Sequence, residues 1–139
     1  MPDMVQGTRQ LWQRTGEALS LFLSRALTAD PGDLPLVLEK LRHCLENRFC
    51  FEQWVLTRSP VQEIEAHCQD HDGLLADLRD IIAQAQTDGP SGCRSALVAF
   101  RDRVNRHLIE RDSAVALACT NEALWVKPTD LRRNLALWR

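Results

Sequence analysis

Residues 59–82 read SPVQEIEAHCQDHDGLLADLRDII, a stretch that combines a helix start signal with a long helical repeat. Ser59 is a favoured N-cap residue, Pro60 suits the first helical position, and Gln62 completes a capping box three residues after the cap. Apolar residues and histidines then recur every three or four residues, at Ile64, His67, His71, Leu74, Leu75, Leu78, Ile81 and Ile82. This spacing predicts an amphipathic helix with one face turned to a core.

The same periodicity occurs in three other stretches, over about residues 5–27, 34–57 and 91–118. Proline and glycine gather in the short connections, at residues 31–35, 59–60 and 89–92. Long helices joined by short connections pack as antiparallel neighbours. We therefore expect an all-α fold, with an antiparallel up-down-up-down four-helix bundle over residues 1–120.

Residues 121–139 form a tail beyond the predicted bundle. Pro128 interrupts this tail, and Leu131, Leu135 and Trp138 then follow at helical spacing. We expect one short amphipathic C-terminal helix here. Its apolar face could cover the end of the bundle, or it could dock a protein partner or a second copy of the chain.

Composition argues against several classes of function. The 139 residues hold 17 lysines and arginines against 19 aspartates and glutamates, and this near-balance predicts no general affinity for nucleic acid or an anionic membrane. No apolar run approaches the roughly 18 residues of a membrane-spanning helix, and we expect no export signal. Five cysteines occur without a Cys-x-x-Cys pair, so we expect a cytoplasmic protein with neither a disulfide framework nor a zinc ribbon.

Three of the four histidines fall on predicted core faces. His67 and His71 lie four residues apart on one face of the third helix, and His107 lies within the apolar stripe of the fourth. A single histidine on such a face is usually a hydrogen-bonded core residue, but three would each need a buried partner. One iron, zinc or other first-row ion would satisfy all three. Cys68 stands where a metalloprotease motif needs glutamate, so we set that motif aside.

Two carboxylates complete the candidate site. Glu52 lies on the inner stripe of the second helix, and Asp112 follows His107 by five residues. A buried carboxylate needs a cation or hydrogen bonds, and a metal held by the histidines would supply a cation. Two simpler interpretations stay open: Glu52 pairs with Arg48 one helical turn away, and Asp112 is a solvated charge.

These segments resemble the hemerythrin family, the HHE cation-binding domains, over about residues 8–118. One helix of the family carries His-x-x-x-His followed by leucines, as residues 67–75 do, and its last bundle helix carries His-x-x-x-x-Asp, as residues 107–112 do. The second helix of the family carries His-Phe-x-x-Glu-Glu, and this chain reads RFCFEQ at residues 48–53. The first helix of the family carries a histidine at the position of Gly16.

The family binds two metal ions, and the resemblance implies that this chain lacks the histidines that bind only the second of them. In the family, one metal takes three histidines, the other takes two, and a glutamate and an aspartate bridge both. The ligands of the three-histidine metal correspond to His67, His71 and His107. The two bridging carboxylates correspond to Glu52 and Asp112. Arg48 and Gly16 replace the two other histidines, so the Arg48 guanidinium would stand in for the second cation. We expect one iron ion, with two ions or none as the alternatives.

The sequence leaves two functions in contention. We expect a hemerythrin-like protein that holds one iron and senses or reacts with oxygen, nitric oxide or peroxide. Oxygen carriage of the hemerythrin kind needs two irons and is not expected. The alternative is a metal-free bundle that acts as a binding or regulatory module, with Arg48, Glu52 and Asp112 in a buried ion network. An enzyme is the least favoured interpretation, since the sequence offers no clear general base or substrate pocket.

Overall fold

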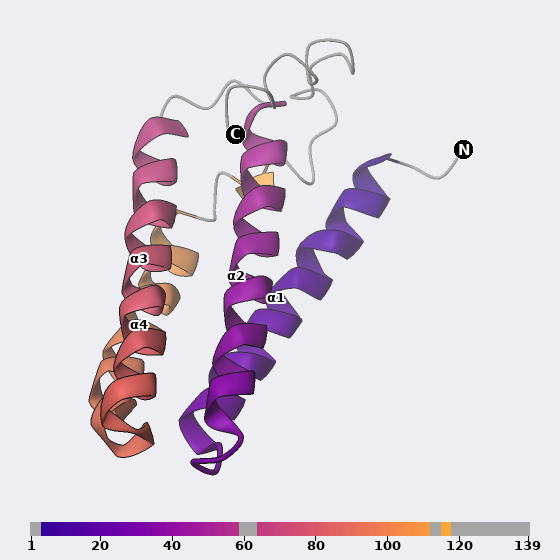
Figure 1. Ribbon diagram of the computed structural model, residues 1–139. Coiled ribbons are helices and arrows are strands. Elements are labelled where there is room, and N and C mark those ends of the chain that lie inside the picture. The colour runs from indigo at the N-terminus through magenta and orange to yellow at the C-terminus, as the bar shows by residue number, and fades with distance from the viewer. Residues whose placement is uncertain (1–3, 59–63, 112–114, 118–139) are drawn as a thin grey trace.

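The computed structural model describes residues 4–58, 64–111 and 115–117. These residues form four long helices: α1 (Met4–Thr28), α2 (Leu34–Leu56), α3 (Ile64–Asp88) and α4 (Pro90–Glu110) (Figure 1). No strand occurs in the described ranges, so the prediction of an all-α fold is confirmed for them. None of the four helices is long and apolar enough to cross a membrane.

Local sequence explains how the helices begin and end. Pro35 lies in the first turn of α2, where a missing backbone N–H costs no helical hydrogen bond. Gly89 alone separates α3 from α4, and its φ of 78° lies in the left-handed region that favours glycine. Pro90 then begins α4 in a position that suits proline.

The fourth helix is shorter than its periodic stretch predicted. It ends at Glu110, and the backbone N–H of Arg111 caps it by donating to the carbonyl of His107. Residues 115–117 are helical again. The capping box at residues 59–62 and the tail at residues 121–139 lie outside the described residues.

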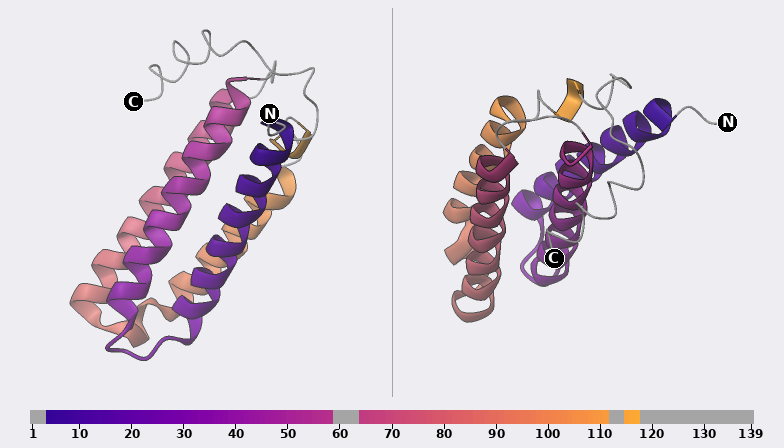
Figure 2. Two further views of the ribbon diagram at one scale, coloured as in Figure 1. Left: turned by 90° about the vertical axis from the view of Figure 1, so that its right-hand side faces the viewer. Right: turned by 90° about the horizontal axis from the view of Figure 1, so that it is seen from above.

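Consecutive helices are the main packing partners. The most extensive contacts join α1 to α2, α3 to α4 and α2 to α3, whereas α1 and α4 contact each other less. The α1–α2 and α3–α4 connections lie at the same end of the molecule (Figure 1). Toward its N-terminus, α1 diverges from α2, as Figure 1 and the view from above in Figure 2 both show.

Two apolar clusters fill the interior at different levels. The larger contains Leu19, Leu23, Ala26, Leu34, Leu38, Leu41, Leu45, Phe49, Leu74, Leu78, Ile81, Cys93, Leu97, Phe100 and Val104. The smaller buries Val55, Leu56 and Val115 against Trp12, Phe51, Trp54 and Ile64. Along α2, Glu52 lies between the two clusters, so the candidate metal ligands form a polar layer with apolar residues on either side.

Candidate metal site

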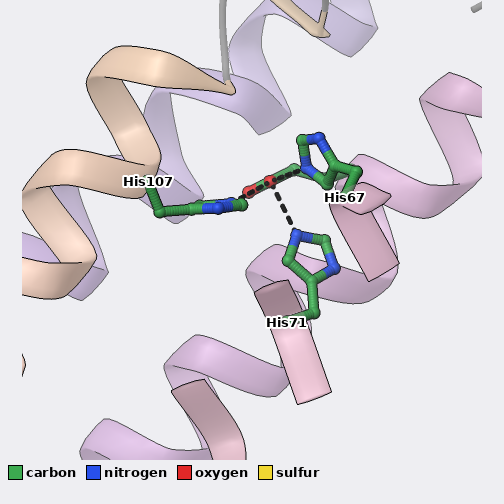
Figure 3. A group of neighbouring side chains, drawn as sticks. His67, His71 and His107 are labelled. Carbon is green, nitrogen blue, oxygen red and sulfur yellow. Dashed lines mark hydrogen bonds and ion pairs between the residues drawn. The ribbon is translucent and has the colours of Figure 1, made fainter. Parts of the chain in front are cut away.

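Four polar side chains from three helices meet in this layer. Glu52 belongs to α2, His67 and His71 lie one turn apart on α3, and His107 belongs to α4. The Nε2 atoms of His67, His71 and His107 lie 2.9, 3.1 and 3.2 Å from Glu52 Oε1. Figure 3 shows the three imidazole rings converging on the carboxylate. The fold thus brings together the three core-face histidines and the inner glutamate that the sequence singled out.

Solvent is excluded from all four side chains. Their exposed fractions are 0% for Glu52, 1% for His71, 3% for His67 and 5% for His107. Phe49 stacks on His71 with ring centroids 3.7 Å apart and planes 7° apart, and it meets His107 edge-on at 5.5 Å. These ring contacts restrict the two imidazole planes and keep their nitrogens directed at Glu52.

Arg48 binds the other oxygen of Glu52. Its Nε donates to Glu52 Oε2 at 3.0 Å, and its Nη1 donates to the Trp12 carbonyl at 2.5 Å and to Thr15 Oγ1 at 2.8 Å. The guanidinium also lies over the Trp12 ring, 3.4 Å from its centroid. A Cβ atom at Gly16 would lie 3.6 Å from Arg48 Nη1. Arg48 therefore lies beside Gly16, which is the other position that the motif resemblance aligned with a histidine.

The protonation states of the cluster follow from burial and hydrogen bonding. Burial raises the pKa of Glu52, but hydrogen bonds from His107, His67 and His71 outweigh it and hold that pKa well below its usual value. Burial lowers the pKa of His71 and outweighs the opposing hydrogen bond to Glu52. At neutral pH, Glu52 is therefore a carboxylate and His71 a neutral imidazole, which are the forms that bind metal ions.

The distances from Glu52 Oε1 to the three histidine nitrogens are compatible with ligands of one metal ion. Neighbouring ligands around an ion lie about 3 Å apart when each metal–ligand bond is about 2.0–2.2 Å. The separations of 2.9 to 3.2 Å between Glu52 Oε1 and the three Nε2 atoms match that value. All four atoms lie within 4.8 Å of one another. The group could hold a metal ion, and three imidazoles with one carboxylate suit several first-row metals.

Outside the four ligand candidates, two polar residues contact the far nitrogens of the imidazoles. Gln53 Nε2 lies 3.4 Å from His71 Nδ1, and Asp70 Oδ2 lies 3.7 Å from His107 Nδ1. Asp70 also accepts a hydrogen bond of 2.8 Å from Arg111 Nε. Sequence reasoning missed both roles, because the only signal was that each residue is adjacent in the chain to a candidate ligand.

Two surface pockets border this site on different sides. One, of about 230 Å³, lies between α3 and α4 and includes His107, Asp70 and Arg111 in its lining. The other, of about 670 Å³, is lined by residues of α1, α2 and α4 that include Arg48 and Gly16. His107 and Arg48, although buried, thus each form part of the wall of a surface pocket.

The remaining predicted ligand, Asp112, lies outside the described residues. No family model, curated protein or solved structure matches this chain. The metal site is therefore supported by its geometry, and the likeness to the hemerythrin family remains one of motifs.

Proposed function

We propose that this chain is a hemerythrin-like, antiparallel up-down-up-down bundle that binds a single iron ion between α2, α3 and α4. The observation that carries the proposal is the convergence of three imidazole nitrogens on one oxygen of Glu52, in a layer closed to solvent. A histidine cluster without such a role would place three polar rings in the core at a considerable desolvation cost. The choice of iron over other first-row metals rests on the resemblance.

The surroundings of Glu52 support one ion over two. Only Oε1 faces the histidines, because Oε2 is bound by Arg48. A carboxylate that bridges two metals commonly gives one oxygen to each, and here the Arg48 guanidinium binds the second oxygen and supplies the second positive charge. The positions that correspond to the second metal's histidines hold Arg48 and Gly16, and neither offers an imidazole.

A single ion in this site would leave room for a small ligand. Three histidines and one glutamate supply four donor atoms, whereas an octahedral ion takes six. The other positions could bind water, oxygen, nitric oxide or peroxide, which supports sensing or reaction with such a molecule rather than oxygen carriage.

The described cysteines, Cys44, Cys50, Cys68 and Cys93, are free thiols, which suits the reducing cytoplasm.

One observation favours the second candidate, a metal-free binding or regulatory module. The carboxylate of Glu52 accepts hydrogen bonds from Arg48 and from the three histidines, so this buried charge is satisfied by protein groups alone. In that case a chelator would leave the protein unchanged, and its function would lie in a partner-binding surface. Metal content separates the two candidates.

The deciding experiment is elemental analysis of untagged protein reconstituted anaerobically with ferrous iron. We expect about one iron per chain, without the absorption bands of an oxo-bridged pair after exposure to air. His71→Ala should lose the iron, and His43→Ala should keep it, because His43 is exposed on the outside of α2. Protein that holds no stoichiometric metal would contradict the proposal, and two irons per chain would contradict the single-ion site.

A further inference from the structure

The side chain of Gln53 lies between two residues of α3. Its Nε2 atom is 3.4 Å from Cys68 Sγ and 3.4 Å from His71 Nδ1. Gln53 follows Glu52 on α2, is half-buried, and faces the ring nitrogen of His71 that points away from Glu52. The ring of His71 is therefore held between a carboxylate at Nε2 and an amide at Nδ1.

These two partners define the tautomer of His71. A carboxylate can only accept, so His71 Nε2 carries a hydrogen and donates it to Glu52 Oε1 across 3.1 Å. The amide nitrogen of Gln53 can only donate, so His71 Nδ1 is the acceptor. Each ring nitrogen thus has a partner of the matching kind.

Metal binding would reverse these roles. An ion at the cluster takes the lone pair of His71 Nε2, and a neutral imidazole then carries its hydrogen on Nδ1. Two donors, the Nδ1–H and the amide NH₂, would then face each other. A half-turn of the Gln53 amide removes the conflict, because its Oε1 atom then accepts the hydrogen from Nδ1.

Cys68 can accommodate both orientations of the amide. In the structure its sulfur accepts from Gln53 Nε2. A thiol is both a weak donor and a weak acceptor, so after a half-turn the S–H group can donate to Gln53 Oε1. No backbone movement is needed, because the two ends of an amide have nearly the same shape.

We propose that Gln53 is a positioning residue of the metal site, whose amide reverses when the ion binds and holds His71 with Nε2 toward the ion. This proposal rests on the proposed function. Residues that orient a ligand histidine through its far nitrogen typically contribute 10- to 100-fold to metal affinity. Gln53 acts through His71 and does not itself bind the ion.

The test uses the full chain and zinc as a diamagnetic probe. Zinc affinity is measured by competition with a chromophoric chelator, and ¹⁵N spectra report which nitrogen of His71 carries the hydrogen. In the wild type we expect it on Nε2 without metal and on Nδ1 with zinc. Gln53→Leu should bind zinc about 10- to 100-fold more weakly, because Nδ1–H then lacks an acceptor.

Two further variants separate this role from a merely structural one. Gln53→Glu keeps an acceptor beside Nδ1 and should retain zinc binding at least as tight as that of the wild type. Gln86→Leu is the matched control: it makes the same substitution at an exposed glutamine of α3, and this variant should bind zinc normally. Circular dichroism of each variant checks that the helices have formed, and Gln53→Glu carries the test if Gln53→Leu fails to fold.

The outcomes distinguish this inference from the proposed function. If the wild type binds zinc and Gln53→Leu binds it as tightly as Gln86→Leu, the role of Gln53 is wrong and the metal site stands. An unchanged tautomer of His71 on zinc binding would likewise overturn the amide reversal. If the wild type binds no metal, the proposed function and this inference both fail.

Discussion

Arg48 is a buried cation with partners on two helices. It is 3% exposed, binds Glu52 on its own helix, and donates to Trp12 and Thr15 of α1. In metal-free protein, Arg48→Met should lower the free energy of unfolding by about 3–5 kcal/mol, because it leaves the Glu52 carboxylate buried without its guanidinium. Urea denaturation in the presence of a chelator measures the loss.

The matched control for Arg48 is another arginine of α2. Arg42 pairs with Glu39 and Glu46 on the surface of the helix, at 2.8 and 2.9 Å. Exposed ion pairs of this kind contribute little to stability, so Arg42→Met should unfold at nearly the same urea concentration as the wild type. Equal losses in the two variants would show that Glu52 does not depend on Arg48.

The charge states of Glu52 and His71 predict that acid destabilises the metal-free protein. Both groups have pKa values below their ordinary values of 4.5 and 6.5 in the folded state. The unfolded chain therefore binds protons more readily than the folded one, and stability falls as pH falls. The loss should begin as pH drops through about 6.5, where unfolded histidine titrates, and grow below about 4.5, where unfolded glutamate titrates.

Urea midpoints measured from pH 8 to pH 5 test this dependence. His71→Gln removes one of the two groups and should reduce the slope between pH 7 and pH 5. His43→Ala, at an exposed histidine of α2, is the control for removing a histidine outside the cluster. A urea midpoint that does not change with pH in the wild type would mean that His71 is not held neutral by burial.

Within α1, Gly16 provides a test at the scale of one helix. Glycine inside a helix costs about 1 kcal/mol relative to alanine. A Cβ at Gly16 would meet Arg48 Nη1 at 3.6 Å, an ordinary contact distance, so Gly16→Ala should stabilise the protein by about 1 kcal/mol without displacing the guanidinium. Thermal unfolding measures the gain.

A second glycine of α1 serves as the control. A Cβ at Gly7 would have no neighbour within 4 Å, so Gly7→Ala reports the helix propensity effect alone. If Gly16→Ala destabilises the protein while Gly7→Ala does not, the space beside Arg48 is tighter than the distance indicates. Glycine would then be required at this position for the arginine to reach Glu52.

For the whole molecule, a bound metal ion should stabilise the folded state by linking three helices. Its ligands come from α2, α3 and α4, and they lie in a layer with apolar clusters on either side. An ion that binds only the folded state stabilises it by about 2.7 kcal/mol at a free concentration 100 times its Kd. We therefore expect ferrous iron to raise the melting temperature and a chelator to reverse the rise.

His71→Ala provides the control for this effect. It removes one ligand, so its melting temperature should not respond to iron or to the chelator. A wild-type melting temperature that is indifferent to both would favour the metal-free module. Stabilisation that persists in His71→Ala would place the ion elsewhere on the protein.

Local sequence patterns predicted four helices and placed ligand candidates on three of them, although α4 ends at Glu110 and not near residue 118. Periodicity of three and four residues predicts which face of a helix is buried, and this placed Glu52, His71 and His107 on inner faces. Spacing of four residues likewise put His67 and His71 on one side of α3. These are properties of a single helix, so they can be read from a single stretch of chain.

Tertiary structure alone decided how the helices meet. The rotation and axial shift of α2 against α3 brought Gln53 to His71, and those of α1 against α2 brought Trp12 to Arg48. The same packing directed Glu52 Oε1 at three histidines of α3 and α4, whereas the pairing of Oε2 with Arg48 is a contact within α2 that the four-residue spacing already allowed. Contacts between helices depend on all the packed side chains at once, so the periodicity of one helix cannot specify them.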